Sequence, residues 1–156
     1  MKPRIGDMDQ ELQVKFAAFS ARMAEAGIPF ALNCVLRTIE EQTAFYAQGR
    51  LPLHEVNVLR SAAGMYLLKT EKENYIVTKT KVSRHFPNQQ GKSRAFDIMI
   101  LRGDNKPHWD LKWDGNEDGI SDYLEAAYIG QGVGLDAGGL WVSWHDYPHY
   151  ELPTKA

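Results

Sequence analysis

The sequence predicts an α+β fold in which helices pack on one face of a small antiparallel sheet. An amphipathic helical pattern over residues 9–26 and a mostly apolar strand pattern over residues 94–101, with Phe96, Ile98 and Ile100 on one face, are its clearest signals. A chain of 156 residues is long enough for one hydrophobic core, and it shows no internal repeat or linker. We therefore expect a single domain over residues 1–156.

The N-terminal half is predicted to form three helices and one strand. The first helix, residues 9–26, carries an apolar stripe formed by Leu12, Phe16, Phe19 and Met23. Residues 30–36 are an apolar run typical of a short buried strand. Thr38 and Glu41 have the spacing of a capping box and begin a second helix, and residues 54–63 form a third.

The C-terminal half is predicted to supply most of the sheet. Its patterns indicate one helix over residues 120–131 and strands at residues 75–82, 94–101, 140–144 and 149–152. Asp97 is the only acid within the apolar run of the second of these strands. Because burying an unpaired carboxylate is costly, we expect Asp97 to have a partner.

Two imidazoles and two carboxylates stand beside these strands: His85, Asp97, Asp146 and His149. Imidazole and carboxylate are ligands of catalytic zinc, and a further carboxylate can handle the proton of an attacking water. Each residue also has an ordinary explanation, such as an exposed loop histidine or a turn-capping aspartate. Asp146 and His149 would lie on opposite faces of a straight strand, although Pro148 favours a turn that brings them together. The residues alone leave both interpretations open.

Three motifs together resemble the D-Ala-D-Ala/L-alanyl-D-glutamate metallopeptidase family. They are Ser83-Arg84-His85, the segment from Gly91 to Asp97, and Asp146-Tyr147-Pro148-His149. The family pattern is Ser-x-His, then Gly-x-Ala-x-Asp, then a Glu or Asp three residues before a His. Residues 36–50 are similar to the family's upstream arginine segment. The family includes phage endolysins and the dipeptidases of vancomycin resistance, and it shares its fold with the hedgehog signalling domain.

The resemblance implies a role for each matching residue. One Zn²⁺ per chain would be held by His85, Asp97 and His149. Asp146 would be the general base that takes a proton from water and passes it to the leaving amine. Arg37 would bind and polarise the scissile carbonyl, and Ser83 would contact substrate.

The resemblance also implies a function: hydrolysis of a bond in peptidoglycan stem peptides. L-Ala-D-Glu is the first choice for that bond, and D-Ala-D-Ala is the second. The chain departs from the pattern in three places. The loop between His85 and Asp97 is long, and we expect it to border the cleft; Gly91 stands further from Asp97 than in Gly-x-Ala-x-Asp; and Leu36 replaces an aromatic residue.

Charge and hydropathy exclude some partners. The net charge of −2, with no lysine- or arginine-rich block, argues against nucleic acid as a partner. No apolar run approaches the roughly 20 residues of a membrane span, and the N-terminus lacks a secretory signal. By analogy with endolysins we expect a monomer made in the host cytoplasm, which reaches the cell wall through a holin-type partner. The one cysteine, Cys34, is expected to be a small buried apolar residue.

Other interpretations are a non-catalytic zinc-binding domain of the same fold and a zinc-dependent nuclease. A structural zinc site would need neither Asp146 nor Arg37, and a nuclease would need a basic face. The polar loop from Asp114 to Gly119 has the composition of a calcium loop, but we place its acids off the EF-hand positions and expect no calcium. His54, His108 and His145 are expected at the surface.

Overall fold

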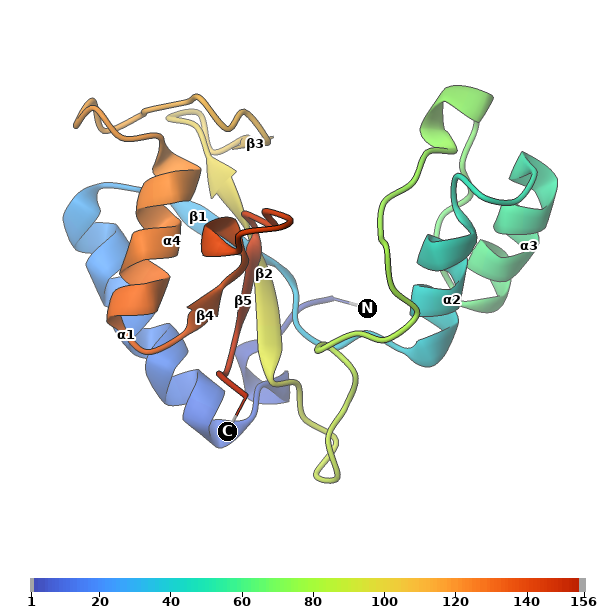
Figure 1. The fold of residues 1–156 in the computed structure, drawn as a ribbon, viewed down its shortest axis with the longest axis horizontal. Coiled ribbons are helices and arrows are strands. Elements are labelled where there is room, and N and C mark those ends of the chain that lie inside the picture. Colours follow the sequence, from blue (N-terminus) through green and yellow to red (C-terminus); the bar gives the residue numbers. More distant parts are fainter. Residues whose placement is uncertain (1, 155–156) are drawn as a thin grey trace.

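The computed structural model describes residues 2–154 and shows two unequal halves (Figure 1). A cleft lined by residues of both halves lies between them. The larger half contains the sheet, with helices α1 (Gln10–Ala26) and α4 (Asp122–Gly132) on one side of it. The smaller half contains α2 (Ile39–Ala47) and α3 (Leu53–Ala62), which lie beyond the opposite side of the sheet. A short turn of 3₁₀ helix, η1 (Ile5–Asp7), precedes α1.

Within residues 2–154, five strands form one antiparallel sheet, as the sequence predicts. Its order is β1-β2-β5-β4, and β3 pairs with β2. The strands are β1 (Phe30–Cys34), β2 (Ala95–Leu101), β3 (Pro107–His108), β4 (Asp136–Ala137) and β5 (His149–Glu151). β2 occupies the centre, where its alternation buries Phe96, Ile98 and Ile100. The other face of β2 carries Asp97 towards the cleft.

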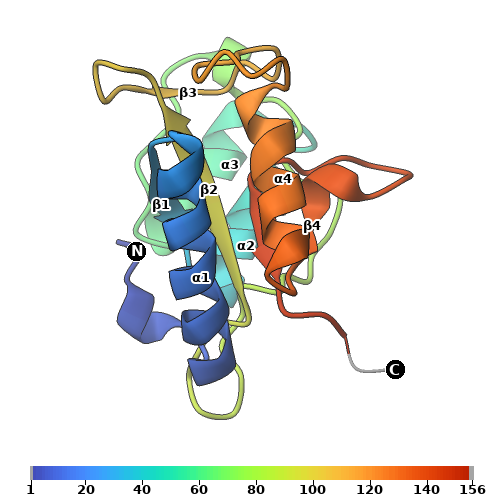
Figure 2. The ribbon, with the colours of Figure 1, turned by 90° about the vertical axis from the view of Figure 1, so that its left-hand side faces the viewer.

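The main core lies between the sheet and the pair α1 and α4 (Figure 2). The stripe of α1 is fully buried there, and Phe16, Phe19 and Phe96 meet in edge-to-face and tilted ring contacts. Asp9 caps α1 by accepting a hydrogen bond from Glu11 N, and Gly27 ends the helix with φ of 73°. The predicted fold class is therefore confirmed, including helices on one face of the sheet.

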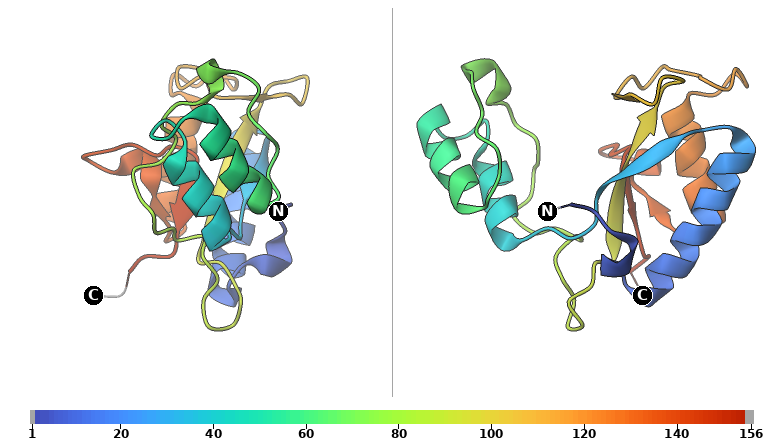
Figure 3. Two further views of the ribbon diagram at one scale, coloured as in Figure 1. Left: turned by 90° about the vertical axis from the view of Figure 1, so that its right-hand side faces the viewer. Right: turned by 180° about the vertical axis from the view of Figure 1, so that it is seen from behind.

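The smaller half consists mainly of α2 and α3, which pack against each other (Figure 3). Thr38 and Glu41 form the predicted capping box of α2. A small apolar cluster of Ala47, Val56 and Leu68 joins α2 to α3. The turn η2 (Glu71–Glu73) then leads into residues 75–82, an irregular segment that we call the strap.

Three local predictions were wrong. The strap is not a strand, because side chains of α2 and of the turn after it bond to its backbone carbonyls in place of a neighbouring strand. Gln42 Nε2 donates to Thr80 O at 2.7 Å, and Arg50 Nη2 donates to Thr78 O at 3.1 Å. Residues 140–144 are not a strand either, because the chain forms η3 (Gly138–Leu140) and then bends.

The long loop between His85 and Asp97 was the third error, since it does not border the cleft. Asn88 Nδ2 donates to Asp9 Oδ2 at 3.1 Å, and Lys92 Nζ donates to Gly6 O at 2.6 Å. The loop is thus fastened to the N-terminal segment, and the strap lines the cleft in its place. No helix within residues 2–154 is long and apolar enough to cross a membrane.

Candidate metal centre

The sheet register brings the candidate residues together. Asp97 of β2 stands opposite Cys34 of β1 on one side and opposite His149 of β5 on the other. Directly opposed side chains lie on the same face of a sheet, so these three groups share one surface. His85 reaches the same surface from a turn, where Ser83 Oγ accepts a hydrogen bond from His85 N at 3.1 Å.

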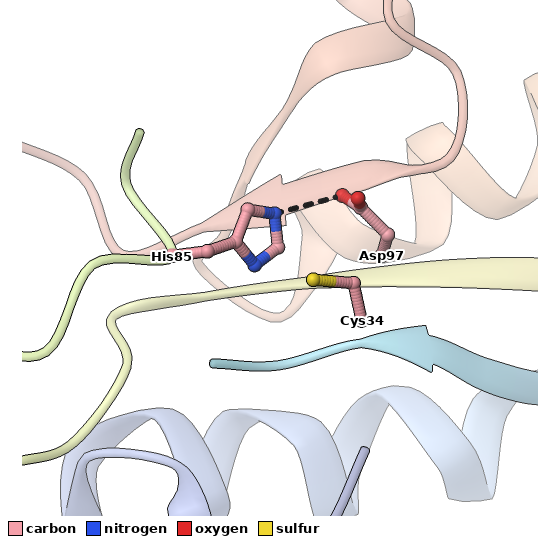
Figure 4. Close-up of side chains that lie close together, drawn as sticks. All are labelled: Cys34, His85 and Asp97. Atoms are coloured by element: carbon pink, nitrogen blue, oxygen red, sulfur yellow. Dashed lines mark hydrogen bonds and ion pairs between the residues drawn. The ribbon is translucent and has the colours of Figure 1, made fainter. Parts of the chain in front are cut away.

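His85 is oriented by a backbone carbonyl. Its Nδ1 lies 2.8 Å from Val35 O. Its Nε2 faces Asp97 Oδ1 at 3.1 Å (Figure 4). Since a carbonyl only accepts hydrogen bonds, Nδ1 carries the proton and the Nε2 lone pair of the neutral ring faces Asp97. The side chain is 3% exposed, so this orientation is enclosed by protein.

His149 is oriented in the same way by Glu151. Its Nε2 donates to Glu151 Oε2 at 2.7 Å, and its Nδ1 lies 3.0 Å from Asp97 Oδ1. The two residues are two apart on β5, and both are buried. An ionised carboxylate accepts only, so the lone pair of neutral His149 also faces Asp97 Oδ1.

This donor set fits a metal ion. Two imidazole lone pairs face one carboxylate oxygen, and that arrangement is satisfied only by a cation or by added protons. Burial alone lowers the pKa of His85, but the Asp97 carboxylate outweighs burial and raises that pKa to about 10. Burial likewise lowers the pKa of His149, and hydrogen bonds to Asp97 and Glu151 raise it to about 9. Burial raises the pKa of Asp97, whereas both imidazoles draw it far below its ordinary value. The site therefore holds positive charge strongly.

Cys34 lies closer to this centre than the sequence indicates. It is half-buried, and its Sγ, one nitrogen of His85 and one oxygen of Asp97 all lie within 4.8 Å of one another. Thiolate is also a zinc ligand. The structure thus offers His149 and Cys34 as alternative third ligands beside His85 and Asp97.

Arg37 lies at the junction of β1 and α2, where its guanidinium is held from three sides. Nη2 lies 3.6 Å from Asp97 Oδ2, and Nη1 donates to Gln42 Oε1 at 3.0 Å. The carbon Cζ also lies 5.0 Å from the ring centroid of Phe45. These contacts aim a permanent positive charge at the cleft wall.

Asp146 lines the same cleft from the loop after η3. Burial raises the pKa of its carboxyl above the ordinary value, and the negative charge of Asp97 raises it further. The loop is placed by Gly138, whose carbonyl accepts from Asp146 N at 2.9 Å. A Cβ at Gly138 would collide with the Asp146 backbone carbonyl, so only glycine permits this approach.

These groups line a cleft of about 260 Å³ between the two halves. The sheet side contributes Asp97, Asp146, His149 and Glu151, and the opposite side contributes Arg37, Gln42 and the strap. At the rim, Lys79 Nζ of the strap lies 4.6 Å from the ring centroid of Trp144. Ser83 also lines the cleft beside His85.

The structure therefore gathers all six residues singled out in the sequence at one place. Sequence reasoning missed Glu151, although its spacing from His149 on a strand places both on one face. It also missed Gln42, whose contacts with Arg37 and the strap are visible only in three dimensions. His54 and His145 are exposed as expected, whereas His108 is buried against Trp113 and Tyr123.

A small α+β domain that gathers imidazole and carboxylate groups in a cleft fits the class of hydrolases that use a metal ion. The sequence is 31% identical over 135 residues to the peptidoglycan L-alanyl-D-glutamate endopeptidase CwlK of Bacillus subtilis (strain 168). The match covers 86% of this chain and 67% of CwlK. No protein-family model matches the chain.

The fold is shared with a solved structure. The L-Ala D-Glu endopeptidase ChiX of Serratia marcescens superposes with a TM-score of 0.56 at 15% identity, over 96% of this chain and 83% of that one. Sequence and fold agree, and the chain belongs to the L-alanyl-D-glutamate endopeptidase family of peptidoglycan peptidases.

Proposed function

We propose that this chain is a zinc-dependent endopeptidase that cleaves the L-Ala-D-Glu bond of peptidoglycan stem peptides, with residues 1–156 acting as one catalytic domain. The observation that carries the proposal is the convergence of His85, Asp97 and His149 on one point beside Asp146. The name of CwlK supports the choice of bond.

The metal would be one Zn²⁺ per chain, held by His85, Asp97 and His149. We favour His149 over Cys34 because Glu151 fixes the ring of His149, as carboxylate partners do for metal-bound imidazoles. When bound with an open coordination position, zinc supplies a Lewis acid and activates water for attack.

Asp146 is proposed as the proton carrier. Its raised pKa suits a group that accepts a proton from the attacking water and then delivers it to the leaving amine. Arg37 would stabilise the negative charge that develops on the scissile carbonyl oxygen. Its contacts with Gln42 and Asp97 keep the guanidinium in place before substrate arrives. Ser83 is proposed to contact the substrate beside His85.

Digestion of purified peptidoglycan tests this function. Mass spectrometry of the products should show new C-terminal L-Ala and new N-terminal D-Glu, and a chelator should abolish both. Products cut between the two D-Ala residues would instead show that the chain cleaves the D-Ala-D-Ala bond, the second choice. Absence of any cleavage by the zinc-loaded chain would leave the non-catalytic alternative.

We further propose that the chain acts as a monomeric endolysin on the host cell wall after a holin-type partner opens the inner membrane. The motif resemblance to phage endolysins supports this. Expression in the cytoplasm should lyse cells when such a partner is co-expressed and leave them intact without it. Lysis that does not depend on the partner would contradict the release route.

A further inference from the structure

The segment between β3 and α4 is an acidic loop outside the cleft. β3 pairs with Ile100 and Leu101, so the loop lies beyond the end of β2 that is farther from Asp97 (Figure 1). Among the described residues, none of 109–121 lines the cleft. The proposed peptidase function therefore leaves this loop unexplained.

The spacing of the loop corrects the expectation that it lacks an EF-hand pattern. Counting from Asp114 as position 1, Asn116 stands at position 3, Asp118 at 5, Gly119 at 6 and Glu125 at 12. That is the full pattern of an EF-hand calcium loop, Asp-x-Asn-x-Asp-Gly followed by five residues and Glu. The earlier placement of the acids off these positions was wrong.

The fold brings Glu125, the last residue of the pattern, close to the earlier positions. Gly119 has φ of 89°, a left-handed conformation that turns the chain into α4. Glu125 lies in the first turn of α4, where its carboxylate is within hydrogen-bonding reach of Asp118. Asn116 Nδ2 donates to Glu125 Oε1 at 3.0 Å. Glu125 at position 12 is therefore in contact with positions 3 and 5.

A buried oxygen atom in this loop has no partner. Asn116 Oδ1 is inaccessible to solvent and accepts no hydrogen bond from any described residue. The amide nitrogen of the same side chain is satisfied by Ala26 O at 2.7 Å and by Glu125. A buried acceptor without a partner is costly, and the side-chain oxygen at position 3 is the atom that an EF-hand loop gives to calcium.

The charges point to the same ligand. Asp118 and Glu125 are neighbouring carboxylates, and burial together with Asp118 raises the pKa of Glu125. Asp122, which is 1% exposed, adds a further carboxyl at position 9. A divalent cation would remove this repulsion. Calcium suits the set better than magnesium, because it accepts several protein oxygens and a bidentate glutamate.

We propose that the loop from Asp114 to Glu125 is a calcium site. Asp114, Asn116, Asp118 and Glu125 supply side-chain oxygens, and the carbonyl of Ile120 stands at position 7. The preceding residues form a turn rather than a helix, so the site consists of the loop and α4 alone. Because Asn116 also bonds to the end of α1, calcium fastens α4 to α1 and stabilises the sheet half.

Calorimetric titration of the zinc-loaded full chain with CaCl₂ tests this site. One ion should bind per chain with a Kd below about 1 mM and should raise the melting temperature. Tb³⁺ should bind in competition with Ca²⁺ and give luminescence on excitation of Trp113, the residue before Asp114. No saturable binding at millimolar calcium would overturn the proposal.

A matched pair of variants separates ligation from general charge attraction. Glu125→Gln removes the ligand at position 12, whereas Glu117→Gln removes the same charge at the non-ligand position 4. Glu125→Gln should weaken calcium binding about tenfold or more, and Glu117→Gln should change it less than about twofold. Equal weakening of calcium binding by the two variants would overturn the proposal. Unchanged zinc content shows that a variant is folded. If Glu125→Gln does not fold, Asp118→Ala removes the ligand at position 5, an exposed residue, in its place.

Discussion

The two walls of the cleft are built differently. The sheet wall carries Asp97 and His149 on paired strands backed by the main aromatic core. The opposite wall carries Arg37, Gln42 and the strap on a half whose apolar cluster is small, and side-chain hydrogen bonds hold it together. The comparison shows that Asp97 and His149 are positioned by strand pairing, whereas the positions of Arg37 and the strap depend on individual side-chain hydrogen bonds.

The largest effect should come from the proton carrier on the sheet wall. Asp146→Asn removes the base without removing a proposed zinc ligand, so peptidase activity should fall by roughly 10²–10⁴-fold while zinc content stays at one per chain. Asp104→Asn, in an exposed turn, is the control and should leave activity unchanged. Full activity of Asp146→Asn would exclude this residue as the base.

Loss of the residue that orients His149 should have the next largest effect. Glu151→Ala frees the ring nitrogen that now bonds to Glu151, so zinc affinity should weaken by roughly 10–100-fold. Competition with a metal-chelating dye measures this affinity. Wild-type affinity in the variant would show that the sheet holds His149 without help from Glu151.

The opposite wall should respond more mildly. Gln42→Leu removes the contacts to Arg37 and to the strap, and kcat/KM should fall about tenfold, as expected for lost hydrogen bonds to a charged group. Gln48→Leu is the matched control, because Gln48 holds Arg60 and Glu73 instead. It should lower the melting temperature but leave kcat/KM of the folded protein near wild type. Equal loss of kcat/KM would contradict a specific role for Gln42.

The last prediction concerns the stability of the metal-free protein and its dependence on pH. The raised pKa values of His85 and His149 stabilise the fold fully below the unfolded-state value of about 6.5. That stabilisation is lost as pH rises through about 9 and 10, where the folded-state groups release their protons. Chelator-treated protein should therefore melt at lower temperature at pH 10 than at pH 6.5. The melting temperature of the zinc-loaded protein should fall less between pH 6.5 and pH 10. An identical pH dependence of the melting temperature in the two forms would contradict this prediction.

Elements with strong local signals were predicted from the sequence. The stripe of α1, the capping box of α2 and the alternation of β2 each appear at the expected residues. The strap was mistaken for a strand because its residues alternate with a period of two, but its hydrogen-bond partners are side chains of α2 and of the turn that follows it. The strand predicted at residues 140–144 is absent because the backbone bends there. The bend lets Gly138 approach Asp146 closely, and these residues pair with no neighbouring strand in the described part of the chain.

The candidate site was partly visible in the sequence. The resemblance to the family's motifs selected His85, Asp97 and His149, and the register of β2 against β5 brings the last two face to face. The proximity of Cys34 was not predicted, because it depends on β1 pairing with β2 across more than sixty residues of sequence. Long-range contacts of this kind leave no local pattern.

Zinc content of two alanine variants tests the account most directly. His149→Ala and Cys34→Ala each remove one of the two alternative third ligands, and inductively coupled plasma mass spectrometry counts the metal. We predict that His149→Ala loses the zinc and the peptidase activity, whereas Cys34→Ala keeps one zinc per chain and most of the activity. Zinc retained by His149→Ala and lost by Cys34→Ala would contradict the proposed centre.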